Sequence, residues 1–115
     1  MSVKIYHNPR CSKSRQTLQL LTEKAIDAEI IEYLKTPPTA AELKELLDML
    51  GLTPRQLMRK KEVEYKESGA DQADLSEQAL IDIMVANPKL IERPIVIKDG
   101  KAAIGRPPEL VLDIL

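Results

Sequence analysis

The first 34 residues of the chain contain two strand-like segments separated by one helix-like segment. Residues 3–7 and 28–34 are short runs rich in β-branched, aliphatic and aromatic side chains, as in strands. Residues 12–24 contain no proline or glycine and carry apolar residues at helical spacing. Two strands joined by a connection of helix length pair in parallel through a right-handed crossover. The sequence therefore predicts an opening βαβ unit.

The next two predicted elements are helices with strong start signals. At residues 39–50, Thr39 and Glu42 form a capping box, leucines follow at helical spacing, and Gly51 provides a stop. A second capping box begins at Thr53, with proline at the first helical position, and predicts a short helix toward Arg59.

The rest of the chain predicts one more helix, a hairpin and a short final helix. Residues 60–74 are mostly polar, and we expect a mobile segment there with a break at Gly69. Ser76 opens a helix that ends at residues 87–88. A hairpin and a final helix follow, at residues 94–97, 99–100, 102–104 and 108–115. The element order predicts a mixed α/β sheet with packed helices.

Composition narrows the class of protein. The chain has 115 residues, 43% of them apolar, which suffices to bury a core without disulfides or metal. We therefore expect a single domain over residues 1–115. A formal charge of -1 argues against a general nucleic-acid surface. Three tyrosines with no phenylalanine or tryptophan leave little to stack on bases.

The chain has one cysteine and one histidine. One cysteine cannot form an internal disulfide, and the two residues cannot build a Cys/His zinc site. No apolar segment has the length of a membrane span or the pattern of a signal peptide. We expect a protein of the reducing cytoplasm, with no metal site, no nucleic acid and no membrane partner.

Cys11 directly precedes the predicted helix 12–24 and follows a turn at residues 8–10. The first N–H groups of a helix lack intrahelical partners and, with the helix dipole, favour a thiolate or a bound oxyanion. Such a position can lower a thiol pKa from about 8.5 by roughly two units. The alternative is a buried cysteine that packs as a small apolar group. The basic neighbours Arg10, Lys13 and Arg15 favour the reactive thiol.

Cys11 and Ser14 have the spacing of a two-cysteine redox motif, with serine in place of the second cysteine. Serine cannot resolve a mixed disulfide, so any redox cycle needs an external thiol. The Ser14 hydroxyl either donates to the thiolate or belongs to an ordinary exposed helix serine. His7 either tunes the thiol, as a cation or hydrogen-bond donor, or packs at the strand end.

Three arginines lie where predicted elements begin or end: Arg59, Arg93 and Arg106. Each has an ordinary explanation, as a helix-terminal or solvated charge. Taken with a thiolate at a helix N-terminus, they indicate an oxyanion pocket, because guanidinium groups bind tetrahedral oxyanions through paired hydrogen bonds. For Pro94, the base rate of about 5 to 6% for cis peptides favours a trans bond.

Four segments, in this order, resemble the glutaredoxin-dependent arsenate reductase family: residues 5–15, 57–60, 87–96 and 105–109. The resemblance spans essentially the whole chain and is far more specific than a lone C-x-x-S pattern. It is strongest to a short branch of the family, because the chain stops at Leu115 without the C-terminal extension of arsenic-resistance members. Arg10 and Ser12 also flank the cysteine where those members have smaller residues.

The resemblance implies a fold and a set of roles. The fold is thioredoxin-like (glutaredoxin-like), a mixed β-sheet with packed helices and a helical insertion between the βαβ unit and the C-terminal ββα unit. Cys11 is implied as the nucleophile that attacks arsenate, with His7 and Ser14 tuning the thiolate. The oxyanion is implied to be held by Arg59, Arg93 and Arg106. The family also implies a cis peptide bond at Pro94.

The resemblance further implies a reduction of arsenate to arsenite through a covalent adduct on Cys11. Glutathione attacks the adduct as co-substrate and glutaredoxin completes the reduction, so we expect these two partners, no bound cofactor and a monomer. Two alternatives stay open. One is a monothiol, glutathione-dependent reductase of another substrate, since the C-x-x-S pattern does not name the electrophile. The other is a non-enzymatic, RNA-polymerase-binding regulator of the same fold, whose members usually keep both cysteines.

Overall fold

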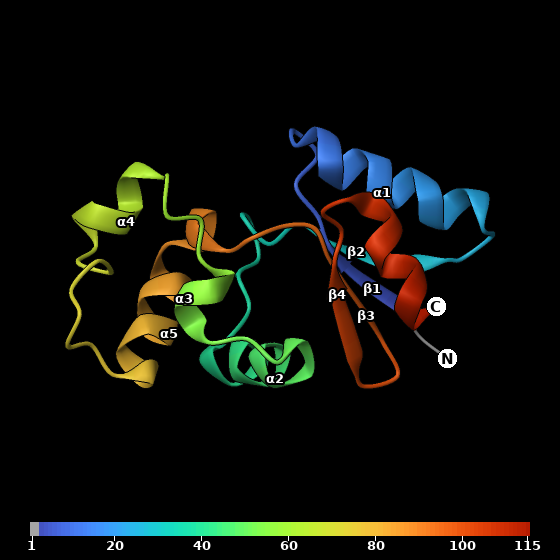
Figure 1. Ribbon diagram of the computed structural model, residues 1–115. Coiled ribbons are helices and arrows are strands. Elements are labelled where there is room, and N and C mark those ends of the chain that lie inside the picture. Colours follow the sequence, from blue (N-terminus) through green and yellow to red (C-terminus); the bar gives the residue numbers. More distant parts are fainter. Residues whose placement is uncertain (1–2) are drawn as a thin grey trace. The chain divides into compact units, whose positions relative to one another are not determined.

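The computed structural model describes residues 3–115, which form two compact units (Figure 1). The first unit combines the chain up to Thr36 with Arg93–Leu115, and the second comprises Pro37–Glu92. The single domain predicted over residues 1–115 stays a prediction. No helix within residues 3–115 is long and apolar enough to cross a membrane.

The first unit is built on a four-stranded mixed sheet in the order β2-β1-β3-β4. Its first two strands pair in parallel, which confirms the predicted βαβ unit, and the other neighbours are antiparallel. Tyr6 of the central strand lies opposite both Ile31 and Ile95. The strands are β1 (Val3–Tyr6), β2 (Ala28–Ile31), β3 (Ile95–Lys98) and β4 (Lys101–Ile104).

Two helices cover one face of this sheet (Figure 1). They are α1 (Ser12–Glu23), drawn in blue, and the 3-10 helix η2 (Pro108–Ile114), drawn in red. The core between them and the sheet consists of five buried apolar residues, namely Val3, Ile5, Leu21, Val96 and Val111. This packing fixes α1 against the strands. The residue that begins α1 is therefore held near the end of β1.

Three local features of this unit differ from or match the predictions. The hairpin turn is confirmed, with positive φ at Asp99 (51°) and Gly100 (77°), as a tight hairpin requires. The second strand ends at Ile31, earlier than predicted, because the chain turns through hydrogen bonds from the N–H groups of Lys35 and Thr36 to the Glu32 carbonyl. The final helix is a 3-10 helix.

The second unit is the predicted helical insertion. Its helices are α2 (Ala40–Leu50), α3 (Pro54–Leu57), α4 (Val63–Glu67), α5 (Glu77–Ala86) and the 3-10 helix η1 (Pro88–Leu90). Both capping boxes are confirmed, at Thr39 and Thr53, and Ser76 caps α5. The core of the unit comes from α2, α3, α5 and η1, through Leu43, Leu46, Leu47, Leu57, Leu80, Ile81, Met84 and Leu90.

The polar stretch at residues 60–74 contains the helix α4, which the sequence did not predict. Its break is at Gly69, with φ +82°, as predicted. The Arg55 guanidinium donates to the carbonyl oxygens of Ala70 and Gln72, and Ala70 is fully buried. Helix α3 therefore holds the chain beyond the break through these two hydrogen bonds of Arg55, which we call the Arg55 clamp. No local sequence pattern predicts it.

Candidate active site

Cys11 is the N-cap residue of α1, with extended backbone angles (φ −93°, ψ 125°). The turn before it is built by Asn8. The Asn8 carbonyl accepts a hydrogen bond from the Cys11 N–H at 3.0 Å, and its side-chain oxygen accepts from the Arg10 N–H at 3.0 Å. Asn8 thus closes the loop that carries the thiol.

Two side chains of α1 tie the same loop to the helix. The Arg15 guanidinium donates to the Pro9 carbonyl at 2.9 Å, and the Asn8 N–H donates to the Ser14 hydroxyl at 3.0 Å. Sequence reasoning missed Asn8 and Arg15 as builders of the loop. An asparagine that bonds the main chain two residues on is a known turn signal, so Asn8 was open to prediction.

Ser14 is fully buried, and its hydroxyl lies 2.7 Å from Nδ1 of His7. The hydroxyl predicted to bond the thiolate therefore pairs with His7 and the Asn8 main chain. Burial lowers the pKa of His7; Arg15 also lowers it, while Glu32 raises it. The lowered pKa favours a neutral ring, so the structure supports an orienting hydrogen bond rather than a cation. That both residues tune the thiolate stays a prediction.

The Cys11 thiol has a pKa below its ordinary value. Burial of the sulfur raises the pKa, but four influences together outweigh it: the main-chain N–H of Ser14, the charge of Arg93, the N–H of Lys13 and the charge of Arg106. The N–H groups favour the thiolate without a short capping bond to the sulfur. The helix N-terminus thus lowers the thiol pKa, in the direction that the sequence predicted. Arg93 and Arg106, which are distant in sequence only, lower it further.

Arg106 reaches the nucleophile directly, since its Nη2 donates to Cys11 Sγ at 3.6 Å. Its Nε donates to the Arg93 carbonyl at 2.8 Å. The hairpin explains this meeting, because Ile95 of β3 lies opposite Ile104 of β4. Arg93 precedes β3 and Arg106 follows β4, so both leave the sheet at the same edge.

Arg93 and Arg106 each precede a cis proline, at Pro94 and Pro107. The cis bond at Pro94 agrees with what the resemblance implied, and the trans bond that the base rate alone favoured is not found. The cis bond at Pro107 was not predicted.

Arg59, the third predicted oxyanion ligand, belongs to the second unit. Its N–H donates to the Leu90 carbonyl at 2.7 Å, next to the bridge between Met58 and Ile91. Its guanidinium forms an ion pair with Glu62 at 2.7 Å. The structure thus brings Cys11, Arg93 and Arg106 together, and a role for Arg59 stays a prediction.

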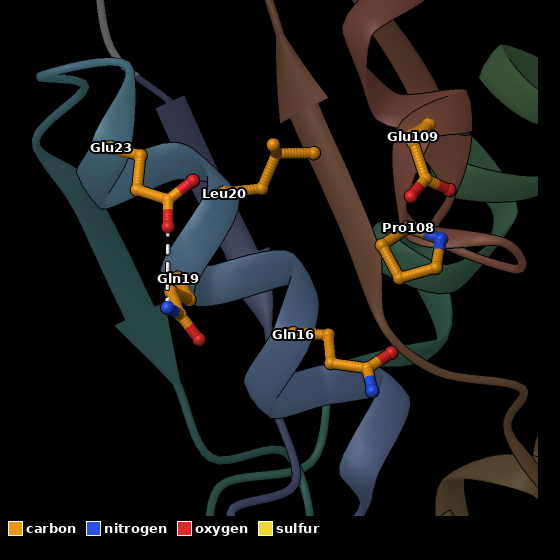
Figure 2. Close-up of a pocket in the computed structure, with 6 residues that line it drawn as sticks. All are labelled: Gln16, Gln19, Leu20, Glu23, Pro108 and Glu109. Carbon is orange, nitrogen blue, oxygen red and sulfur yellow. Dashed lines mark hydrogen bonds between the residues drawn. The ribbon is translucent and has the colours of Figure 1, made fainter.

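A shallow hollow between α1 and η2 is a separate feature of the first unit (Figure 2). It is lined by Gln16, Gln19, Leu20, Glu23, Pro108 and Glu109, a set that includes neither the thiol nor an arginine. Across residues 3–115 no group of three or more His, Cys, Asp or Glu side chains is placed to hold a metal ion. The cluster of Cys11, Arg93 and Arg106 is therefore the candidate active site.

Comparison with known families identifies the group to which this arrangement belongs. Residues 6–114 match the ArsC family. The chain belongs to the ArsC family. The match covers the loop of Cys11 and the hairpin that carries both arginines.

Two curated relatives are similar to the chain over nearly their whole length. The chain is 60% identical over 114 residues to the Escherichia coli (strain K12) protein YfgD, covering 98% of this chain and 96% of that protein. It is 50% identical over 114 residues to a Neisseria meningitidis protein named arsenate reductase, covering 98% and 97%.

A solved structure described as an arsenate reductase from Vibrio cholerae superposes with a TM-score of 0.96. It is 54% identical in sequence, covering 100% of this chain and 98% of that one. The fold is thioredoxin-like, as the resemblance implied.

Proposed function

We propose that this protein reduces arsenate to arsenite, with Cys11 as nucleophile, glutathione as the resolving thiol and glutaredoxin as the final reductant. The observation that carries the proposal is the 3.6 Å contact between the Arg106 guanidinium and Cys11 Sγ. A cation beside a thiolate both lowers the thiol pKa and provides paired donors for an incoming oxyanion. Several full-length relatives are named arsenate reductases, which supports arsenate as the oxyanion.

The first step forms a sulfur–arsenic bond. The Cys11 thiolate attacks arsenic(V), and one protonated oxygen of arsenate leaves as water. Arg93 and Arg106 oppose the negative charge on the remaining oxygens, and a guanidinium stays charged throughout. The thiolate needs no separate base, because its lowered pKa supplies the charged form.

The reduction needs thiols from outside the chain, because Cys11 is its single cysteine. Glutathione displaces a second oxygen as water and joins the arsenic. A glutaredoxin thiolate then attacks the glutathione sulfur, forms a mixed disulfide and leaves two electrons on arsenic. Hydrolysis of the remaining bond releases arsenite and restores the Cys11 thiol. Two thiols are oxidised to one disulfide, arsenic gains two electrons, and one water is lost overall.

Ser14, at the position of a resolving cysteine, is buried and bonded to His7 and Asn8. It therefore supports the loop rather than the redox cycle. This agrees with a monothiol mechanism that borrows its second thiol.

The test couples the reaction to NADPH oxidation by glutathione reductase, with arsenate, glutathione and glutaredoxin present. We expect NADPH consumption by the wild type and by the control Ser12→Ala, which alters an exposed neighbour. Cys11→Ser is expected to abolish it, because a hydroxyl does not form the thiolate. Equal rates for Cys11→Ser and wild type would exclude the proposal.

Intact-mass measurement separates arsenate reduction from one of the two alternatives, a monothiol reductase of another substrate. After exposure to arsenate and glutathione, an arsenic-containing adduct on Cys11 supports arsenate reduction. Glutathione alone on Cys11, with arsenate present, favours a monothiol reductase of another substrate.

A further inference from the structure

Gly105, between β4 and Arg106, approaches helix α1 too closely for any side chain. A Cβ atom built at this position would lie 2.5 Å from Thr17 Oγ1 and 2.9 Å from Pro94 Cγ, distances that real Cβ atoms essentially never show. The Gly105 N–H also donates to the Pro94 carbonyl at 2.9 Å. A steric limit therefore keeps this position a glycine.

Thr17 cannot easily yield to such a side chain. It is fully buried, and its hydroxyl donates to the Lys13 carbonyl at 2.9 Å. Ser14 and Leu21 are buried on the same helix. Because Cys11 begins this helix, the surface that stops Gly105 is rigidly connected to the nucleophile.

The chain on the other side of the contact leads directly to the candidate site. The Arg106 N–H bonds the Ile104 carbonyl at 3.0 Å, across Gly105. Its guanidinium spans from the Arg93 carbonyl to Cys11 Sγ. A displacement of the backbone at Gly105 would therefore move the guanidinium relative to the sulfur.

We propose that the contact between Gly105 and Thr17 is a spacer that sets how closely the Arg106 guanidinium approaches Cys11. Both are positioning residues, since they act through Arg106. The part of this inference that concerns arsenate rests on the proposed function. The part that concerns the thiol is independent of it.

The test compares two glycine substitutions in the same hairpin unit. Gly105→Ala places a Cβ against Thr17 and Pro94, whereas Gly100→Ala strains a turn with φ +77° and meets nothing within 4 Å. Both are expected to lower thermal stability. Only Gly105→Ala is expected to shift the pH profile of iodoacetamide alkylation toward that of Arg106→Gln, meaning a higher Cys11 pKa. It is also expected to raise the KM for arsenate about tenfold with a smaller change in kcat.

Relief of the clash provides the second arm. The double variant Thr17→Ala/Gly105→Ala removes both Thr17 atoms that the new Cβ would meet and leaves only the contact with Pro94. It is expected to recover part of the wild-type alkylation profile. A wild-type profile in folded Gly105→Ala, or no recovery in the double variant, overturns the proposal.

If Gly105→Ala does not fold, a comparison of Thr17→Ala with the control variant Thr22→Ala tests the proposal instead. Thr22 makes the same kind of hydroxyl bond, to the Leu18 carbonyl, on the exposed side of α1. Thr17→Ala removes the atoms that limit the approach of Gly105, so we expect it to shift the Cys11 alkylation profile where Thr22→Ala does not. Equal alkylation profiles for the two variants overturn the proposal. Alkylation needs no arsenate, so a wild type without arsenate turnover removes the proposed function while these comparisons still decide the spacer.

Discussion

Helices α1 and α2 begin in opposite ways. At the start of α2, the Thr39 hydroxyl accepts from the Glu42 N–H at 3.1 Å, and the Glu42 carboxylate accepts from the Thr39 N–H at 2.9 Å. At the start of α1, Cys11 makes no side-chain capping bond, and the first turn carries Lys13 rather than an acid. Helices α3 and α5 have side-chain caps like that of α2.

The difference separates a helix start built for stability from one built for binding. A capping box satisfies the free N–H groups and places a carboxylate at the positive end of the dipole. Helix α1 leaves its N–H groups and dipole to act on the sulfur, and Arg93 and Arg106 add to the same potential. Helix α4 also begins without a side-chain cap, so the candidate site is marked by the combination of an uncapped start, a thiol and two nearby arginines.

Replacing Arg106 tests whether the reactivity of Cys11 at the start of α1 depends on residues outside that helix. We expect the largest loss of activity from this replacement. Arg106→Gln should lower kcat/KM for arsenate about 10- to 100-fold, because a charged donor to the oxyanion is lost. The pH profile of Cys11 alkylation should move to higher pH, since Arg106 helps to lower the thiol pKa.

Arg10→Gln is the matched control, because Arg10 is an exposed arginine adjacent to Cys11 in sequence. It should leave kcat/KM within about threefold of wild type. Similar losses in both variants would mean that the general positive charge of the loop, not the Arg106 contact, activates the thiol.

Removing the cap of α2 tests the other side of the comparison. Thr39→Ala should lower the free energy of unfolding by about 1 kcal/mol, because the Glu42 N–H loses its acceptor. Chemical denaturation measures the loss, and Thr39→Ser should restore most of it. The Cys11 alkylation profile should not change; a shifted profile would show that the two helix starts are coupled.

Supplying a cap to α1 should have the smallest effect. In Cys11→Ser the hydroxyl can accept from the first-turn N–H groups, so at about pH 5 the variant should be more stable by about 0.5 kcal/mol. The depressed thiol pKa stabilises the wild type fully above the unfolded-state pKa, and this contribution is lost as pH falls through the folded pKa.

The advantage of Cys11→Ser should therefore shrink as pH rises, which denaturation at a series of pH values measures. A serine variant less stable than wild type at about pH 5 would show that the sulfur already satisfies this helix end.

The elements that followed from local patterns were those whose signals lie within a few residues. The capping boxes at Thr39 and Thr53 and the turn at Asp99 and Gly100 were predicted because each is a contact between near neighbours in sequence. Helix α4 and the Arg55 clamp were not predicted. The clamp joins Arg55 to Ala70 and Gln72, which lie 15 and 17 positions further along the chain. The Ser14 hydroxyl bonds His7 rather than Cys11, because the chain turns back after β1 and places α1 beside the end of that strand.

The sequence by itself determined the reactive group and its helix: a single cysteine before an uninterrupted helical run, followed by a serine that cannot resolve a disulfide. Tertiary structure alone decided what faces that cysteine. Arg106 is 95 positions away, and its approach depends on the register of the hairpin and on the space that Gly105 leaves beside Thr17. The physical reason is range, because helix-end electrostatics arise within one turn of chain, whereas packing sets distances between segments that sequence order does not connect.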